Sequence, residues 1–233
     1  MVLVTLDPQA LEDNTTPMIA PQTLYVELRM CFDRVQAQFT ASSRLIQAAL
    51  LITAYEYACG KPHAAYISAG ISARMASVLG INNYNQPNLD ANNKSDIGLR
   101  LNITEKQHIY WGIIMLERLV LFECPLDRLK PALDFPDPQT KLPDDLLSTK
   151  FSDDTERRAS VCDISSNEVG TFGRQIQALS FLVQVLQLTE ENATPVSELI
   201  KLDEKLRGFL GVLMNQSSQT HTCGANGITI RYV

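Results

Sequence analysis

A strongly apolar segment at residues 104–124, TEKQHIYWGIIMLERLVLFEC, constrains the fold more than any other part of the chain. Apolar side chains recur along it every three or four residues and also fill most positions in between, which is typical of a helix buried on nearly all sides. Thr104, followed three residues later by Gln107, matches a capping box, and Pro125 cannot continue a helix. We therefore predict a buried helix that begins at Thr104 and ends before Pro125.

Two charged residues, Glu117 and Arg118, lie inside this apolar segment. A buried charge without a partner is strongly destabilising, so both side chains need opposite charges, dipoles or a polar cavity. One interpretation is a structural ion pair that fixes the register of the helix. The other is a pocket for an effector, with Trp111 within two turns of both charges. Trp111, Glu117 and Arg118 are therefore the candidate structural or effector-pocket residues.

Apolar residues at helical spacing also predict helices elsewhere, at residues 23–39, 42–60, 62–80, 172–188 and 194–214. Serine caps the second of these and glycines close the second and third, while prolines open the third and fifth. Small residues at three- and four-residue steps in 62–80 favour a tight antiparallel hairpin with 42–60. The fold class is thus all-α, a helical bundle of antiparallel helix pairs with long proline-rich and Asn-rich loops.

The first predicted helix, residues 23–39, is amphipathic. Its apolar positions are Leu24, Leu28, Cys31, Val35 and Phe39, at successive spacings of 4, 3, 4 and 4 residues.

Four other segments lack a helical pattern. The Asn-rich residues 82–103 predict a surface loop, and the proline-rich residues 125–143 predict an extended segment that packs on the domain through its leucines. The polar residues 148–167 predict a mobile linker. Residues 215–233 change abruptly to polar coil with a short β-prone end, which predicts disorder.

These segments define three regions of the chain. Residues 1–21, with three prolines, are predicted to be an extended leader. Residues 22–214 form one helical domain, and residues 215–233 form a disordered or non-native tail.

Charge and cysteine spacing argue against several classes of function. Twenty basic and 26 acidic residues give a net charge of −6, with no basic cluster to bind nucleic acid. The five cysteines are scattered and contain no C-x-x-C pair, which argues against zinc and disulfide frameworks. No apolar run is long enough to span a membrane, and no nucleotide-binding or hydrolase motif occurs. We expect a soluble intracellular protein with no catalytic, cofactor-binding or metal-binding residues.

Three blocks of the sequence carry a family resemblance. The first, LIQAALLITAYEYACGKPHAAYISAGISARMASVLGI at 45–81, has a helix, a glycine turn and a small-residue helix that ends in Leu-Gly-Ile. The second, at 110–145, has Trp111, then Glu117 and Arg118, then the proline-rich FPDPQTKLPDD. The third is FGRQIQALSFLVQVLQL at 172–188. In this order and spacing the blocks resemble the fungal-specific transcription factor domain, the middle homology region of zinc-cluster regulators.

The resemblance implies a nuclear, all-helical regulatory domain of a transcription factor for RNA polymerase II, and not an enzyme. In that family a six-cysteine zinc cluster contacts DNA, and the regulatory domain binds protein partners of the transcription machinery or a small-molecule effector. This sequence contains no such cluster, basic linker or coiled coil, so zinc and DNA binding have no residues here to carry them. We expect residues 22–214 to be an incomplete copy of the domain, from a fragment or a truncated gene model.

Two alternatives come from other classes of protein. One is a helical scaffold that senses a small molecule or binds proteins, and the other is an enzyme that uses Glu117 and Arg118. The surroundings of these two side chains would separate the hypotheses: a solvent-filled cavity favours a ligand site, and closure on each other and on backbone favours a structural role.

Overall fold

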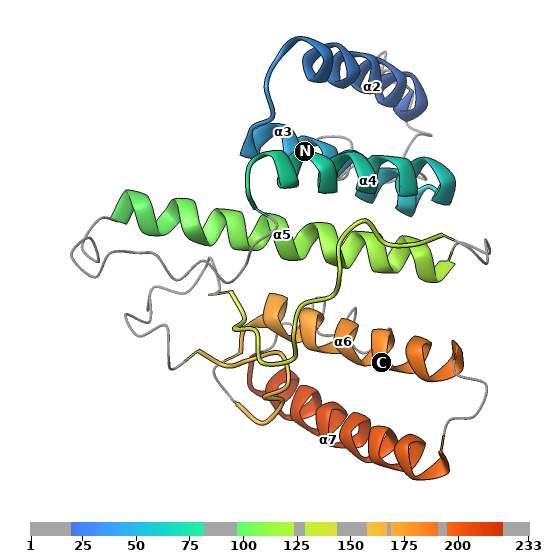
Figure 1. Cartoon of the computed structure of the whole chain (residues 1–233), viewed down its shortest axis with the longest axis vertical. Helices are drawn as coiled ribbons and strands as arrows, with labels where there is room; N and C mark the ends of the chain where they lie inside the picture. Colours follow the sequence, from blue (N-terminus) through green and yellow to red (C-terminus); the bar gives the residue numbers. More distant parts are fainter. Residues whose placement is uncertain are drawn as a thin grey trace, which may run out of the picture. The chain divides into compact units, whose positions relative to one another are not determined.

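The described part of the chain is all-helical (Figure 1), which confirms the predicted fold class at that level. The computed structural model describes residues 20–81, 97–123, 129–143, 158–166, 169–190 and 195–220. Its helices are α2 (Pro21–Gln38), α3 (Ser43–Ala58), α4 (Pro62–Val78), α5 (Ile97–Glu123), α6 (Thr171–Glu190) and α7 (Val196–Thr220). Within these ranges, the only β-type pairing is an isolated bridge between Lys141 and Ser160.

The helices divide into two compact units, where the sequence was interpreted as one domain over residues 22–214. Unit 1 comprises residues 1–86 and 105–134, and unit 2 comprises residues 87–104 and 135–233. Unit 2 has a core of its own, because α6 and α7 face each other with large apolar side chains. That core contains Ala178, Phe181, Leu202, Phe209 and Leu213, with Ile164, Leu188 and Leu206 at its edge.

Helices α3 and α4 pack against each other in unit 1, close to the predicted bounds (Figure 1). The Ser42 hydroxyl accepts a hydrogen bond from the Leu45 amide at 3.2 Å and caps α3. Gly60 turns the chain with φ +67°, a conformation that side chains with a Cβ disfavour, and Pro62 opens α4. The contact is close because α4 presents small buried residues, namely Ala65, Ser68, Ala69, Ser72, Ala73 and Ala76.

Helix α5 is buried as predicted, but it begins at Ile97, seven residues before the predicted start. Thr104 is buried inside the helix and therefore does not cap it. The predicted Asn-rich loop, residues 82–103, therefore includes the first residues of α5. Residues 99–101 are good helix formers, and the single Asn102 does not stop a helix. The remainder of that predicted loop, residues 82–96, lies outside the described residues.

The proline-rich segment packs down, as predicted, over its described residues 129–143. Leu142 is buried, and Leu129, Leu133 and Phe135 are half-buried. These leucines anchor an otherwise extended chain to the helices.

The predicted mobile linker at 148–167 is wrong for residues 158–166, which pack in unit 2. The Leu142 amide donates to the Ala159 carbonyl at 2.9 Å, and the Val161 amide donates to the Thr140 carbonyl at 3.0 Å. Val161 is buried. Backbone pairing therefore orders a stretch whose polar composition had indicated a linker. Residues 148–157 and 167 lie outside the described residues.

Helices α6 and α7 confirm the last two predicted helices, but the predicted boundary after Met214 is six residues too early. Helix α7 continues to Thr220, since residues 215–220 contain neither glycine nor proline. Gln216 is also held by a hydrogen bond from Arg174 Nε at 3.0 Å. Residues 221–233, with the β-prone end, and residues 1–19 of the predicted leader lie outside the described residues.

Helix α2 confirms the predicted first helix, but most of its apolar stripe is exposed. Phe32 is its buried residue, whereas Cys31 and Phe39 are exposed and Leu28 and Val35 keep 43% and 40% of their surface. The face turned to α3 is instead set by polar contacts from Tyr25 and Arg29, described below.

Candidate functional site

The three candidate residues Trp111, Glu117 and Arg118 all lie in the buried part of α5. Trp111 has no exposed surface, and Glu117 and Arg118 keep 1% and 8% of theirs. The Trp111 ring packs edge-on against Tyr110, with ring centroids 5.9 Å apart. Such burial means that the two charged side chains have exchanged water for partners within the protein.

Those partners are the backbone groups of residues 132 and 133, in the proline-rich segment. Glu117 Oε1 accepts a hydrogen bond from the Ala132 amide at 2.6 Å, and Oε2 accepts one from the Leu133 amide at 3.3 Å. Arg118 Nη2 donates to the Leu133 carbonyl at 2.6 Å, and Arg118 Nη1 lies 4.0 Å from Glu117 Oε2. The two side chains therefore hold the amide and the carbonyl of Leu133 from adjacent positions on one helix.

Burial is the main electrostatic influence on this pair. Loss of water raises the pKa of Glu117, an effect that the two amides and Arg118 partly oppose. Loss of water also lowers the pKa of Arg118, opposed by Glu117 and Asp134. Burial of each charge thus raises the free energy of the folded state, and the backbone hydrogen bonds offset part of this increase.

Glu117 and Arg118 thus close on backbone groups of residues 132 and 133. Each oxygen of Glu117 already accepts a hydrogen bond from a backbone amide. A general base needs a lone pair within reach of a substrate proton, and Glu117 keeps only 1% of its surface exposed. The arrangement is suited to fastening residues 132–133 to α5.

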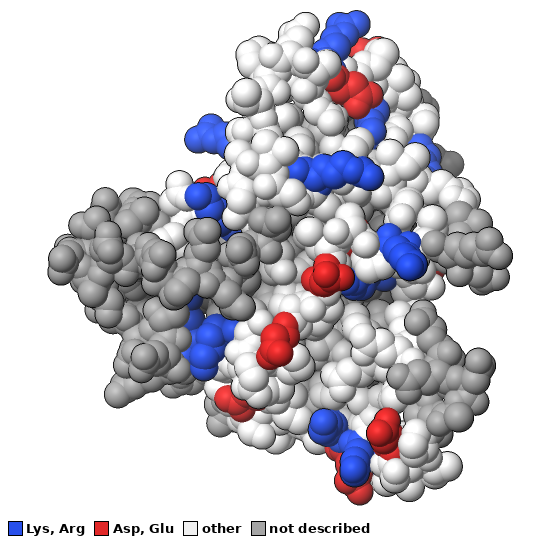
Figure 2. Space-filling model, in the orientation of Figure 1, with Lys and Arg blue, Asp and Glu red and all other residues white. Residues whose placement is uncertain are grey.

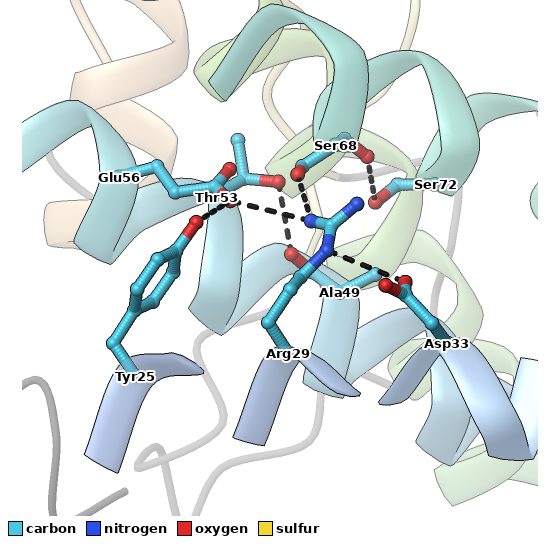
Figure 3. A network of polar contacts seen from close by, with 8 residues as sticks. All are labelled: Tyr25, Arg29, Asp33, Ala49, Thr53, Glu56, Ser68 and Ser72. Atoms are coloured by element: carbon cyan, nitrogen blue, oxygen red, sulfur yellow. Dashed lines mark hydrogen bonds and ion pairs between the residues drawn. The ribbon is translucent and has the colours of Figure 1, made fainter. Parts of the chain in front are cut away.

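A second buried polar group, missed in the sequence, joins α2, α3 and α4 (Figure 3). Glu56 on α3 has no exposed surface. Its Oε1 accepts hydrogen bonds from the Tyr25 hydroxyl at 2.7 Å and from Arg29 Nη1 at 3.2 Å. Arg29 Nη1 also donates to Ser68 Oγ on α4 at 2.6 Å. We call Tyr25, Arg29, Glu56 and Ser68 the Glu56 cluster.

The Glu56 cluster sets the rotation of α2 about its axis. Arg29 is further held by Asp33 one turn later, at 3.3 Å (Figure 3). The second carboxylate oxygen of Glu56 is buried and has no hydrogen-bond partner among the described residues. The sequence contains only a weak indication of these contacts, because Glu56 lies between two tyrosines in a stretch that is apolar on most sides.

We predict that Tyr25 ionises at unusually high pH. Burial, together with the hydrogen bond to Glu56 and its charge, raises the pKa of Tyr25 to about 12 from 10.0. Because the folded pKa is the higher one, this contribution to stability is complete below pH 10 and is lost as pH rises through 12. The difference in phenolate absorbance between wild type and Tyr25→Phe should titrate near 12. A difference centred near 10 would show that the Glu56 contact is not formed.

A third buried polar group lies in unit 2, around Arg174 of α6. Arg174 Nη1 donates to the Ile164 carbonyl at 2.9 Å and to Gln177 Oε1 at 2.8 Å. Its Nη2 donates to the Ser166 carbonyl, and its Nε donates to Gln216 of α7. Burial lowers the pKa of Arg174, and the charge of Asp163 opposes this. We call Arg174 with these acceptors the Arg174 cluster.

Surface charges are mixed in sign. On the face drawn in Figure 2, the basic and acidic side chains of the described residues are interspersed in each unit. Over the described ranges, no three His, Cys, Asp or Glu side chains come together to hold a metal ion. Of the helices that the structure describes, none combines the length and apolarity needed to cross a membrane.

Comparisons with protein-family models, curated proteins and solved structures found no match to this chain.

Proposed function

We propose that this chain is a regulatory module of a fungal transcription factor, which acts in the nucleus on transcription by RNA polymerase II. Its resemblance to the fungal-specific transcription factor domain motivates the proposal. Contact with DNA is assigned to a zinc cluster outside this sequence, because the scattered cysteines and the acidic balance provide neither a cluster nor a basic surface. The module itself would bind protein partners of the transcription machinery.

One observation carries the proposal most directly. Two separated parts of the second family-like block are in contact, since Glu117 and Arg118 hold the backbone of residues 132–133, just before the proline-rich FPDPQTKLPDD. Such packing requires an acidic residue, an arginine and a later extended segment in the same chain. The contact therefore supports a structural reason for the spacing of these features, on which the resemblance depends.

The same contact bears on the alternatives. Burial of both side chains, with their hydrogen bonds made to backbone groups, supports a structural role for Glu117 and Arg118 over an enzyme that uses them. A helical scaffold for proteins or a small molecule remains the second candidate, and the apolar surface exposed on α2 favours a protein partner over a small molecule. We also propose that the helices form a bundle of antiparallel pairs joined by long loops.

A reporter assay tests the proposed function. The full chain would be fused to a heterologous DNA-binding domain, alone and together with a strong activation domain, and expressed in yeast. We expect reporter output to change several-fold in at least one fusion, upward for activation or downward for repression. Glu117→Ala should abolish the change, while the exposed substitution Arg207→Ala should preserve it. Unchanged output from a fusion shown to be folded and nuclear would contradict the proposal.

A further inference from the structure

The exposed apolar stripe of α2 is unusual, because the sequence is patterned to bury it. Leu24, Leu28, Cys31 and Val35 follow one another at spacings of 4, 3 and 4 residues, the a and d pattern of a coiled-coil seam. Leu24 is half-buried, and the other three are exposed. The stripe therefore has the periodicity of a helix–helix interface, but no helix among the described residues buries it.

The Glu56 cluster explains why the stripe faces outward. Tyr25, Arg29 and Phe32 occupy the side of α2 that contacts α3, about a quarter turn from the stripe. Glu27 and Arg34 are exposed and border the stripe on its opposite side. In coiled-coil terms, both charges occupy g positions, and Tyr25 and Phe32 occupy e positions.

We propose that this stripe pairs with the α2 stripe of a second copy of the chain, in antiparallel orientation. Around a two-fold axis, Leu28 would face Cys31 of the second copy, and Leu24 would face Val35 of the second copy. In an antiparallel pair the g positions lie opposite each other, so Glu27 meets Arg34 of the second copy, twice by symmetry. The charges are complementary in this arrangement.

A parallel pair fits the same residues less well. Positions g would then face positions e of the next heptad, which places Phe32 opposite Glu27 and Phe39 opposite Arg34. Neither charge would then gain a partner of opposite charge. The charges on α2 thus select orientation as well as partner.

Sedimentation velocity on the full chain over a range of concentrations tests the pairing. A short interface of about three turns should give a weak dimer, with a dissociation constant on the order of micromolar. Leu28→Glu and Val35→Glu should each raise that constant by about tenfold or more, since each places a charge in the seam. The matched control is Ile200→Glu, which alters a residue of α7 that is 55% exposed and should leave the dimer unchanged.

A charge exchange tests the orientation. Glu27→Lys alone, or Arg34→Glu alone, should weaken the dimer several-fold, because each creates two like-charge contacts. The double variant Glu27→Lys/Arg34→Glu should restore the wild-type constant. A monomer at all concentrations, a dimer lost in Ile200→Glu but not in Leu28→Glu, or a double variant no better than the single ones would overturn the proposal. Circular dichroism of each variant confirms that α2 stays folded.

Discussion

Arg174→Ala should lower the free energy of unfolding by about 4 kcal/mol, because it removes a buried cation that organises unit 2. The guanidinium donates hydrogen bonds to the carbonyls of Ile164 and Ser166 and to the side chains of Gln177 and Gln216. Alanine would leave these acceptors without their donor and would open a cavity among α6, α7 and residues 158–166. Both effects destabilise the folded state.

Urea denaturation followed by far-ultraviolet circular dichroism measures this loss. Arg207→Ala is the matched control, since Arg207 pairs with Asp203 on the surface of α7 with 77% of its side chain exposed. An exposed pair one turn apart contributes less than about 0.5 kcal/mol. Equal unfolding midpoints for the two variants would mean that the Arg174 cluster does not form.

Glu117→Ala has the second largest expected effect, a loss of about 3 kcal/mol. The substitution leaves the buried Arg118 without its nearest opposite charge and removes the acceptor from two backbone amides. Arg118→Ala should cost a similar amount, because the buried carboxylate then loses the nearby positive charge.

Fluorescence of Trp111 reports this change, because it is the chain's one tryptophan and lies on the same helix. Glu123→Ala is the control on α5, where the carboxylate is exposed and accepts a hydrogen bond from the Tyr57 hydroxyl. A shift in the urea midpoint is expected for Glu117→Ala and not for Glu123→Ala. Identical midpoints would show that the Glu117 contacts are not formed in solution.

Helices α3 and α4 were predicted well from local patterns. Ser42 and Pro62 occupy the positions expected for a cap and a first helical residue, and Gly60 adopts the positive φ of a helix end. These features depend on residues only a few positions apart, so the sequence displays them directly. The early start of α5 was not predicted, because the asparagines of residues 82–103 indicate a loop although residues 99–101 among them favour a helix.

The orientation of helices was harder to predict, since it depends on contacts between distant residues. In α2 the apolar stripe is largely exposed, and Tyr25 and Arg29 turn another face toward Glu56, 31 and 27 residues away. Hydrophobic periodicity carries no information about such polar pairs. The two faces also serve different partners if the stripe pairs with a second copy, as proposed above.

The candidate site was predicted in location but not in its contacts. Burial of Glu117 and Arg118 followed from their apolar neighbours on α5, whereas their partners are backbone groups that any residue at 132–133 would supply. Arg174 lies in the predicted helix at residues 172–188, and its hydrogen bond to Gln216 spans 42 residues. Buried polar residues whose partners lie far along the chain give no local signal.

Hydrogen exchange at the amides of Ala132 and Leu133, followed by NMR in wild type and Glu117→Ala, tests the structural role of Glu117 most directly. Ala132 is exposed on the surface, so protection of its amide must come from its hydrogen bond to Glu117. We expect slowed exchange at both amides in the wild type and a return to the rate of an unstructured chain in the variant. Exchange at the unstructured rate in the wild type would contradict the claim that Glu117 and Arg118 fasten this segment to α5.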